Sequence, residues 1–203
     1  MGRTLWKPIQ GFDSANVFTP DDLMDGNSVI GNWTSGNVAI YDDDHYYMGG
    51  ILAELLATKG CNVLLVTPAP LVSYWGQFTL EQERVQHKLT KLGVQIHVQS
   101  VLREIKIDSV EISNTISGDE VEFLRDGVVL VCDRISNDGL YYQLKPALET
   151  GRLQSLRVIG DAEAQNIIAQ ATFAGHLAAR EFDEEKVDGT PFKVERVMVS
   201  PSP

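Results

Sequence analysis

The 203-residue sequence predicts an α/β fold built on a buried, largely parallel sheet. Residues 62–68, NVLLVTP, form a nearly continuous apolar run, which is typical of strands covered on both faces. Residues 46–60 carry apolar side chains at helical spacing and end at Gly60. Because residues 37–41, NVAIY, read as a strand ahead of that helix, the order matches a parallel strand–helix–strand unit.

Composition narrows the classes of function. The chain carries 43% hydrophobic residues and a net charge of −11, which argues against binding to nucleic acids or anionic membranes. No apolar run approaches the roughly 20 residues of a membrane span. Residues 1–14 contain no apolar signal core, so we expect a cytoplasmic protein. Cys61 and Cys132 sit in apolar, strand-like settings; we expect buried structural thiols, too few for a zinc or iron–sulfur site.

Residues 1–35 lack periodicity and are expected to form an extended lead-in or linker. Within them, residues 19–26, TPDDLMDG, have the pattern of a short helix. Thr19 can cap it, Pro20 suits the first helical position, and the two following aspartates favour the positive end of the helix dipole. Gly26 is expected to end this helix.

Residues 36–133 are expected to form a Rossmann-like domain. After the strand at 62–68 and a loop, Thr79 and Gln82 form a capping-box pattern at the start of a second helix, residues 79–93. The pattern then alternates, which predicts a third strand, an antiparallel meander and a return strand at 127–132. The fold class is therefore an α/β, Rossmann-like three-layer nucleotide-binding fold of the FAD/NAD(P)-binding type, with a β-meander.

Residues 134–203 read as the closing segment of a second domain, of the FAD- or ADP-binding type. We expect a short helix at 139–150, a strand from Leu156 to Ile159, a tight turn at Gly160–Asp161, a long helix after it, and a final strand at 192–199. The opening strand and glycine turn of such a domain are not found in the sequence.

The turn after the first strand is acidic where a dinucleotide-binding domain is usually rich in glycine. Residues 42–45 read DDDH. Gly49 and Gly50 lie beyond this turn, inside the predicted helix, and cannot form the glycine-rich turn of a dinucleotide site. Two like charges about 4 Å apart repel by about 1 kcal/mol in water and about 4 kcal/mol near a protein surface. A pyrophosphate would therefore be disfavoured here, and the segment after the second strand, VTPAP, offers no acid or arginine for a ribose.

Two interpretations of residues 42–45 remain open. One is a self-capped helix start packed by Tyr46 and Tyr47, in which the aspartates favour the helix dipole. The other is a site for a divalent metal or a cationic amine. The four histidines are scattered without ligand spacing, so we predict no metal ligands and no catalytic residues. An aromatic loop with Tyr74, Trp75 and Phe78 either faces a partner domain or anchors its own loop.

The segment IGDAEA, from residue 159, is the candidate for nucleotide binding. Gly160 permits close approach of a ligand to the backbone, and a helix starting after Asp161 would point free N–H groups at the turn. A carboxylate here can accept hydrogen bonds from hydroxyls without facing a phosphate. The same carboxylate could simply cap the helix.

Four stretches together resemble a known family. They are TPDDLMDG, DDDHYYMGGILAELLATKG, FTLEQERVQHKLTKLG and VIGDAEAQNIIAQATFAGHLAAREF. They look like the C-terminal part of the trimethylamine, dimethylamine and histamine dehydrogenases, which are old-yellow-enzyme-like flavoproteins related to 2,4-dienoyl-CoA reductase. The family often has proline where Gln165 stands.

The resemblance implies a larger protein. In that family an N-terminal barrel carries FMN and a [4Fe-4S] cluster, and an NAD(P)-domain-like unit is inserted in an FAD-like domain. Residues 36–133 would match the insert, and Gly160 and Asp161 would contact ADP or FAD in the completed domain. The implied function is oxidative demethylation or deamination of a small amine, with a barrel domain or subunit and an electron-transfer protein as partners. A non-catalytic assembly module and an NAD(P)H-binding reductase domain remain alternatives, and a homo-oligomer is possible.

Overall fold

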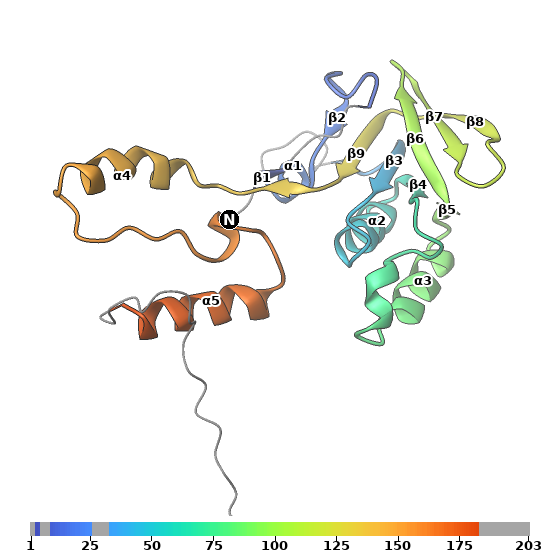
Figure 1. The fold of residues 1–203 in the computed structure, drawn as a ribbon. Coiled ribbons are helices and arrows are strands. Elements are labelled where there is room, and N and C mark those ends of the chain that lie inside the picture. The colour runs from blue at the N-terminus through green and yellow to red at the C-terminus, as the bar shows by residue number, and fades with distance from the viewer. Residues whose placement is uncertain (1–2, 5–8, 26–32, 183–203) are drawn as a thin grey trace, which may run out of the picture. The chain divides into compact units, whose positions relative to one another are not determined.

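The computed structural model describes residues 3–4, 9–25 and 33–182 (Figure 1). The chain divides into two compact units, one spanning Thr4–Arg134 and the other formed chiefly by the residues from Ile135 on. We call them the core unit and the closing unit and describe each by itself. The two-residue strands β1 (Arg3–Thr4) and β10 (Arg134–Ile135) fall where these units adjoin in sequence.

A five-stranded parallel sheet forms the centre of the core unit, with strand order β2-β9-β3-β4-β5. Its strands are β2 (Val17–Phe18), β3 (Asn37–Asp42), β4 (Asn62–Val66), β5 (Gln95–His97) and β9 (Gly127–Val131). The register pairs Ala39 with Leu64 on one side and with Val128 on the other. The predicted mixed α/β fold with a parallel sheet is confirmed.

Two helices cover one face of this sheet. The helices α2 (Met48–Thr58) and α3 (Gln82–Lys91) pack against the strand residues that point to their side, such as Val38 and Ile40. The predicted end of α2 is confirmed, since Gly60 follows it with a φ of +104°. Only glycine adopts this conformation without strain, so the chain can reverse there into β4.

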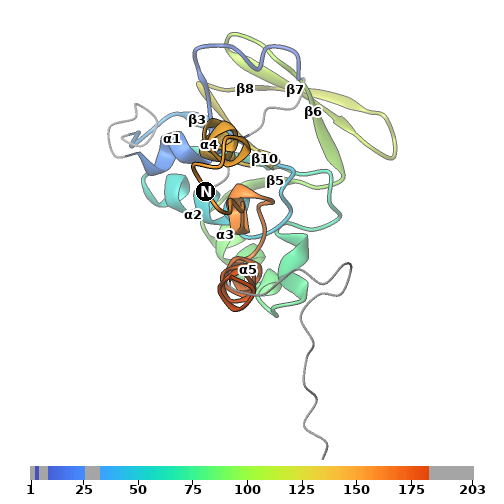
Figure 2. The same ribbon diagram turned by 60° about the vertical axis from the view of Figure 1, so that its left-hand side comes forward.

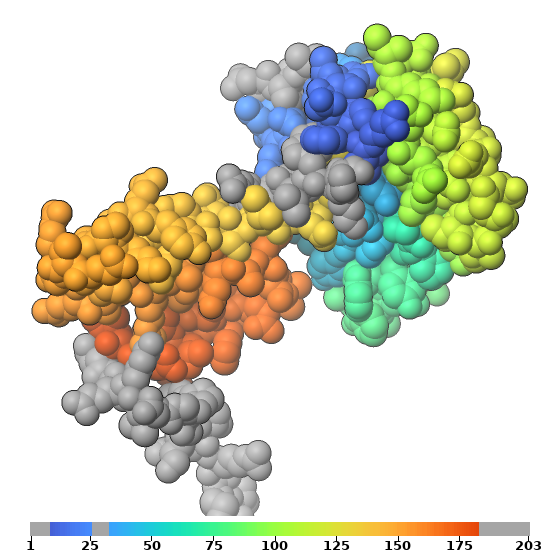
Figure 3. Space-filling model, turned by 45° about the horizontal axis from the view of Figure 1, so that its top comes forward, coloured from blue at the N-terminus to red at the C-terminus, as the bar shows by residue number. Residues whose placement is uncertain are grey.

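The predicted meander covers the opposite face. Strands β6 (Ser100–Ile105), β7 (Ser109–Asn114) and β8 (Glu120–Leu124) pair antiparallel in that order. Their apolar residues pack against the alternate strand positions, including Ala39 and Tyr41. Figure 2 shows the meander and the helices α2 and α3 on different sides of the unit, and Figure 3 shows the meander along its margin. The core unit therefore has three layers: helices, parallel sheet and antiparallel sheet.

The short helix α1 (Pro20–Met24) begins as predicted. The Thr19 hydroxyl accepts a hydrogen bond from the backbone N–H of Asp22, and the Asp22 carboxylate accepts one from the Thr19 N–H. These reciprocal bonds form a capping box. The helix is capped at its C-terminus by Asp25, and the predicted stop at Gly26 lies outside the described residues.

The predicted capping box of the second helix is wrong. Helix α3 begins at Gln82 rather than Thr79, and its N-cap, Glu81, makes no side-chain capping bond. The Thr79 hydroxyl instead donates to the carbonyl of Gly76, at the end of the 3-10 helix η2 (Tyr74–Gln77). Gln82 is buried and donates to the carbonyl of Val72. Both side chains that the pattern assigned to the helix cap therefore form hydrogen bonds to the preceding loop instead.

The closing unit differs from prediction in two places. Its elements are α4 (Gly139–Glu149), the 3-10 turn η3 (Gly160–Ala162) and α5 (Ile168–Arg180). The helix expected directly after the turn begins at Ile168, several residues later. Leu156 to Ile159 form no strand, because no neighbouring strand pairs with them within the described chain. The predicted strand at 192–199 lies outside the described residues. Between 135 and 182, no residue is buried.

Candidate functional site

The carboxyl end of strand β3 places an aspartate inside the protein. Asp42 is completely buried, and its Oδ1 accepts a hydrogen bond of 3.2 Å from the backbone N–H of His45. Its Oδ2 is also buried and has no hydrogen-bond partner among the described residues. Burial, and then the neighbouring carboxylate of Asp44, raise the pKa of Asp42 to about 7. This carboxyl group therefore holds its proton up to neutral pH.

His45 fixes the loop that follows. It has a left-handed φ of 61°, and its carbonyl accepts a hydrogen bond of 2.9 Å from the N–H of Trp75. Its ring Nε2 lies 3.3 Å from Asp43 Oδ1, and its Nδ1 lies 3.5 Å from Thr67 Oγ1. The loop after β3 is thus tied to residues that follow β4 at the same edge of the sheet.

The aspartates do not cap α2, so that part of the self-capped interpretation is wrong. The N-cap of α2 is Tyr47, which makes no side-chain capping bond, and the first turn holds no acidic residue. Asp42 instead caps a tight turn that ends at His45, before the helix begins. Tyr46 and Tyr47 contact each other edge to face, with ring centroids 5.0 Å apart.

The space that a pyrophosphate would need is filled. A Cβ added to Gly49 would lie 2.5 Å from Asp42 Oδ2, so the first turn of α2 rests directly on the carboxyl group. The glycine here serves helix–strand contact and leaves no cradle for a phosphate. These residues do not fit a dinucleotide pyrophosphate. No group of three or more potential metal ligands occurs among the described residues.

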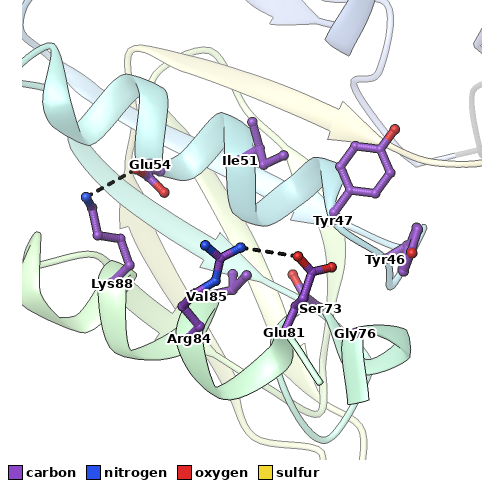
Figure 4. A pocket seen from close by; sticks show the side chains of 10 residues that line it. All are labelled: Tyr46, Tyr47, Ile51, Glu54, Ser73, Gly76, Glu81, Arg84, Val85 and Lys88. Atoms are coloured by element: carbon purple, nitrogen blue, oxygen red, sulfur yellow. Dashed lines mark hydrogen bonds and ion pairs between the residues drawn. The ribbon is translucent and has the colours of Figure 1, made fainter. Parts of the chain in front are cut away.

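A groove lies beside this loop, between α2 and α3 (Figure 4). It has a volume of about 370 Å³. Its lining combines apolar and aromatic side chains with two ion pairs, and comprises Tyr46, Tyr47, Ile51, Glu54, Ser73, Gly76, Glu81, Arg84, Val85 and Lys88. Lys88 Nζ lies 3.4 Å from Glu54 Oε1, and Arg84 pairs with Glu81 at 3.2 Å. The sequence patterns did not indicate this groove, although its outer helix residues are unusually apolar.

The predicted nucleotide-contact residues lie in the closing unit. Gly160 has a φ of 60°, and Asp161 follows it in the half-exposed turn η3. The Asp161 carboxylate makes no hydrogen bond or ion pair within the described chain, so it is available to accept from ligand hydroxyls. The free N–H groups of α5 are not at this turn, because that helix begins only at Ile168. The ribose or ribityl contact of Asp161 stays a prediction, and the dipole of α5 would not contribute to it.

The cysteines are buried as predicted, and no disulfide joins them. Cys61 and Cys132 are 6% and 5% exposed, and burial raises the pKa of the Cys61 thiol. Of the aromatic loop, Trp75 and Phe78 remain 48% and 75% exposed. Their rings contact each other at a centroid distance of 5.6 Å.

Comparison with known proteins decides the family. The family model described as "OYE-like second alpha/beta domain" matches residues 18–137, which is more than half of the chain. The chain belongs to this family. The resemblance to the amine dehydrogenases is confirmed by this match together with the relatives described next.

Three relatives of this chain are named as dehydrogenases or oxidases of amines. Dimethylamine dehydrogenase of Hyphomicrobium sp. (strain x) is 31% identical over 94% of this chain and 28% of its own length. Histamine dehydrogenase from Rhizobium sp. 4-9 superposes with a TM-score of 0.84 at 36% identity, over 99% of this chain and 31% of that one. The 6-hydroxypseudooxynicotine amine oxidase from Pseudomonas geniculata N1 superposes with a TM-score of 0.83 at 38% identity. The match covers 91% of this chain and 27% of that one.

The chain thus spans less than a third of the length of these relatives. Within its described residues, no helix is both long and apolar enough to cross a membrane. The buried Asp42 was missed at the sequence level because three consecutive aspartates suggested solvent-exposed charges. Its position directly after the apolar strand residues 38–41 was the available signal.

Proposed function

We propose that this chain is the nucleotide-fold part of a larger amine dehydrogenase-type flavoprotein. The observation that carries the proposal is the identity of 31 to 38% to three proteins named as dehydrogenases or oxidases of amines. The whole protein would oxidise a small amine by demethylation or deamination. The domain retains the Rossmann-like arrangement of β3, α2 and β4 but has the phosphate position closed by Asp42 and Gly49.

The redox groups would belong to a barrel outside this chain. FMN would accept electrons from the amine, and a [4Fe-4S] cluster would pass them on. Cys61 and Cys132 do not fit as cluster ligands, because both are buried at the strands of the core unit. Asp161 is the residue of this chain that would hold ADP or FAD, by accepting hydrogen bonds from its hydroxyls.

Electron transfer to a protein acceptor agrees better with these residues than transfer to NAD(P)+. The contact between Gly49 and Asp42 closes the pyrophosphate position, and no acid or arginine follows β4 to bind a ribose or its phosphate. We therefore assign the role of partner to a barrel domain or subunit and to an electron-transfer protein.

The test is made on the protein isolated from its natural source. Intact mass analysis should find these residues covalently continuous with a larger chain that reduces its flavin when an amine is added. An Asp161→Ala variant of that protein should lose co-purifying adenine nucleotide, whereas Asp138→Ala, a control in the same unit, should retain it. Isolation of the 203-residue chain alone with amine-oxidising activity would overturn the proposal, as would micromolar binding of NADH or NADPH.

A non-catalytic assembly module is the second candidate. It is favoured by the closing unit, in which none of the residues 135–182 is buried and α4 and α5 both expose apolar side chains. Such a unit would be completed by a separately encoded barrel subunit. Recovery of the 203-residue chain in a stable complex with that subunit would favour this candidate over the covalent arrangement.

A further inference from the structure

The loop between β3 and α2 closes over a buried carboxyl group. Asp42 is completely buried, and the sheet register places it beside Val131 of β9. Its Oδ2 has no hydrogen-bond partner among the described residues, and the first turn of α2 packs directly against this oxygen at Gly49. A buried negative charge costs most where no donor compensates it. The closed loop therefore accommodates Asp42 in its neutral, protonated form.

Residues 43–47, which we call the β3–α2 loop, are linked both to Asp42 and to the turn η2. The backbone N–H of His45 donates to Asp42 Oδ1 at 3.2 Å, and the His45 carbonyl accepts from the N–H of Trp75 at 2.9 Å. His45 holds a left-handed φ of 61°, a conformation that few residues other than glycine adopt. Such a conformation persists where the surrounding bonds impose it. Loss of the bond at Asp42 would therefore loosen His45 and, through it, Trp75.

The charges within this loop act on Asp42 in opposite directions. The carboxylate of Asp44 opposes ionisation of Asp42, whereas His45 favours it. The ring of His45 is shared with Asp43, whose Oδ1 lies 3.3 Å from the ring Nε2. In β3, burial is the main reason that the pKa of Tyr41 rises to about 12, so its hydroxyl stays neutral at about pH 7. The loop and its strand thus give no full compensation for a charge on Asp42.

The charged groups of the neighbouring elements act mainly on Asp44 rather than on Asp42. The side chains that lie near the loop from these elements are Cys132, Asp133 and Arg134 after β9, Thr67 after β4, and Asp21 in α1. Arg134 favours the ionised form of Asp44 and also pairs with Asp21. The first turn of α2, MGGI, carries no charged residue. An ionised Asp42 would therefore be a buried charge with no ion-pair partner in the described part of the chain.

We propose that Asp42 is a proton-operated latch, which holds the β3–α2 loop closed while it is protonated and releases the loop, with Trp75, when it ionises. Water stabilises the ionised carboxylate, and the loop must move for water to reach it. With the loop closed, the pKa of Asp42 is about 7; with the loop open, it returns toward the ordinary value of 3.8. The fraction of open loop should therefore rise about tenfold per pH unit below about pH 7 and level off above it. Release changes the exposed surface that Trp75 and Phe78 form.

The test is amide hydrogen exchange of the full 203-residue chain, resolved to single residues by NMR and compared with that of Asp42→Asn. We expect the ratio of wild-type to variant rates at His45 and Trp75 to rise about tenfold per pH unit from about pH 5 and to level off above about pH 7. The ratio removes the pH dependence of the exchange reaction itself. Amides of β4 should exchange at least about tenfold more slowly at each pH, because they require global unfolding. Division of the wild-type rates by those of an unfolded chain gives the same test without the variant.

Two further variants identify the titrating group. His45→Asn removes the imidazole but keeps a residue that tolerates the left-handed backbone, and it should retain the rise at Trp75. Asp44→Asn should move the point at which the rates level off to lower pH, since the charge of Asp44 raises the pKa of Asp42.

Asp126→Asn is the matched control. This exposed carboxylate accepts the N–H of Asn37 at 2.7 Å, at the opposite end of β3 from Asp42. In this variant, the amides of His45 and Trp75 should exchange as in the wild type. A ratio that does not change with pH would overturn the proposal, as would loss of the rise in His45→Asn. Equal exchange rates of the His45 and β4 amides would also overturn it, because the loop would then open only by global unfolding.

Discussion

The core unit and the closing unit differ in how far their side chains are buried. In the core unit, the parallel sheet is covered on both faces, and residues such as Ile40, Leu64 and Leu130 are completely buried. In the closing unit, α4 and α5 have no buried residue, and side chains such as Phe173 are largely exposed. The two units adjoin in one chain, yet only one of them has a core within the described residues.

This difference has an energetic meaning. Burying an apolar side chain contributes about 1.5 to 3 kcal/mol, which must offset the conformational entropy lost on folding. Isolated helices shorter than about 12 to 15 residues are marginal in water, and α4 and α5 are 11 and 13 residues long. The core unit therefore stabilises itself, whereas the closing unit depends on further contacts with its apolar side chains.

Truncation of a buried leucine should have the largest effect. Leu64→Ala removes a completely buried side chain in the middle of the sheet, and we expect it to lower the free energy of unfolding by about 2 to 5 kcal/mol. Leu140→Ala, at a position 67% exposed in α4, should change it by less than about 0.5 kcal/mol. Urea denaturation followed by fluorescence measures both. Equal losses would show that the closing unit shares the core.

The pH dependence of stability should depend on Asp42. In the unfolded chain its carboxyl group titrates near 3.8, whereas in the folded protein its pKa is about 7. Between these values the folded state binds more protons than the unfolded state, so stability falls as pH rises. The full difference corresponds to about 4 kcal/mol as an upper limit.

Asp42→Asn keeps an oxygen acceptor for the His45 N–H but carries no charge. Stability of this variant, measured by denaturation from about pH 4 to about pH 8, should fall less steeply than that of the wild type. A variant profile that falls as steeply as that of the wild type would contradict the buried, protonated state of Asp42.

Two glycine-to-alanine substitutions should act in opposite directions. Gly49→Ala places a Cβ against the Asp42 carboxyl group, and we expect a loss of about 1 to 3 kcal/mol. Gly175 lies inside α5, where an added Cβ meets no atom within 4 Å. Gly175→Ala should stabilise that helix locally by about 1 kcal/mol. Thermal denaturation reports the first change; amide exchange within α5 reports the second. Loss of stability in both variants would contradict the open surroundings of α5.

Loss of a helix cap should have the smallest effect. Thr19→Ala removes the capping box of α1 and should lower global stability by about 1 kcal/mol. Asn166→Ala removes the side-chain oxygen that accepts from the Ile167 N–H just before α5. Because α5 is not part of the core, this change should not alter the global unfolding midpoint. A shift of similar size in both variants would argue for one cooperative unit.

The elements of the core unit could be predicted because local and tertiary signals agree there. The apolar run of β4, the glycine stop after α2 and the alternation in the meander each determine one structure. The capping pattern at Thr79 and Gln82 failed because both side chains have better partners in the preceding loop. Such competition between loop and helix cannot be read from spacing alone.

The candidate site was only partly predictable, for a different reason. The sequence predicted that the charges of the acidic turn oppose a pyrophosphate, whereas the structure buries Asp42 against Gly49. Asp161 was placed in a tight turn as expected, whereas the strand before it did not form. A strand requires a neighbour with which to share hydrogen bonds, and none is present in the described chain.

Hydrogen exchange measured by mass spectrometry on the full chain tests the central contrast most directly. Amides of β3, β4 and β9 should exchange only through global unfolding, whereas those of α4 and α5 should exchange through local opening. We expect the strand amides to exchange at least about a thousandfold more slowly, equivalent to about 4 kcal/mol. Equal protection of α5 and β4 would contradict the account, since it would show that the closing unit is stabilised as part of the same core.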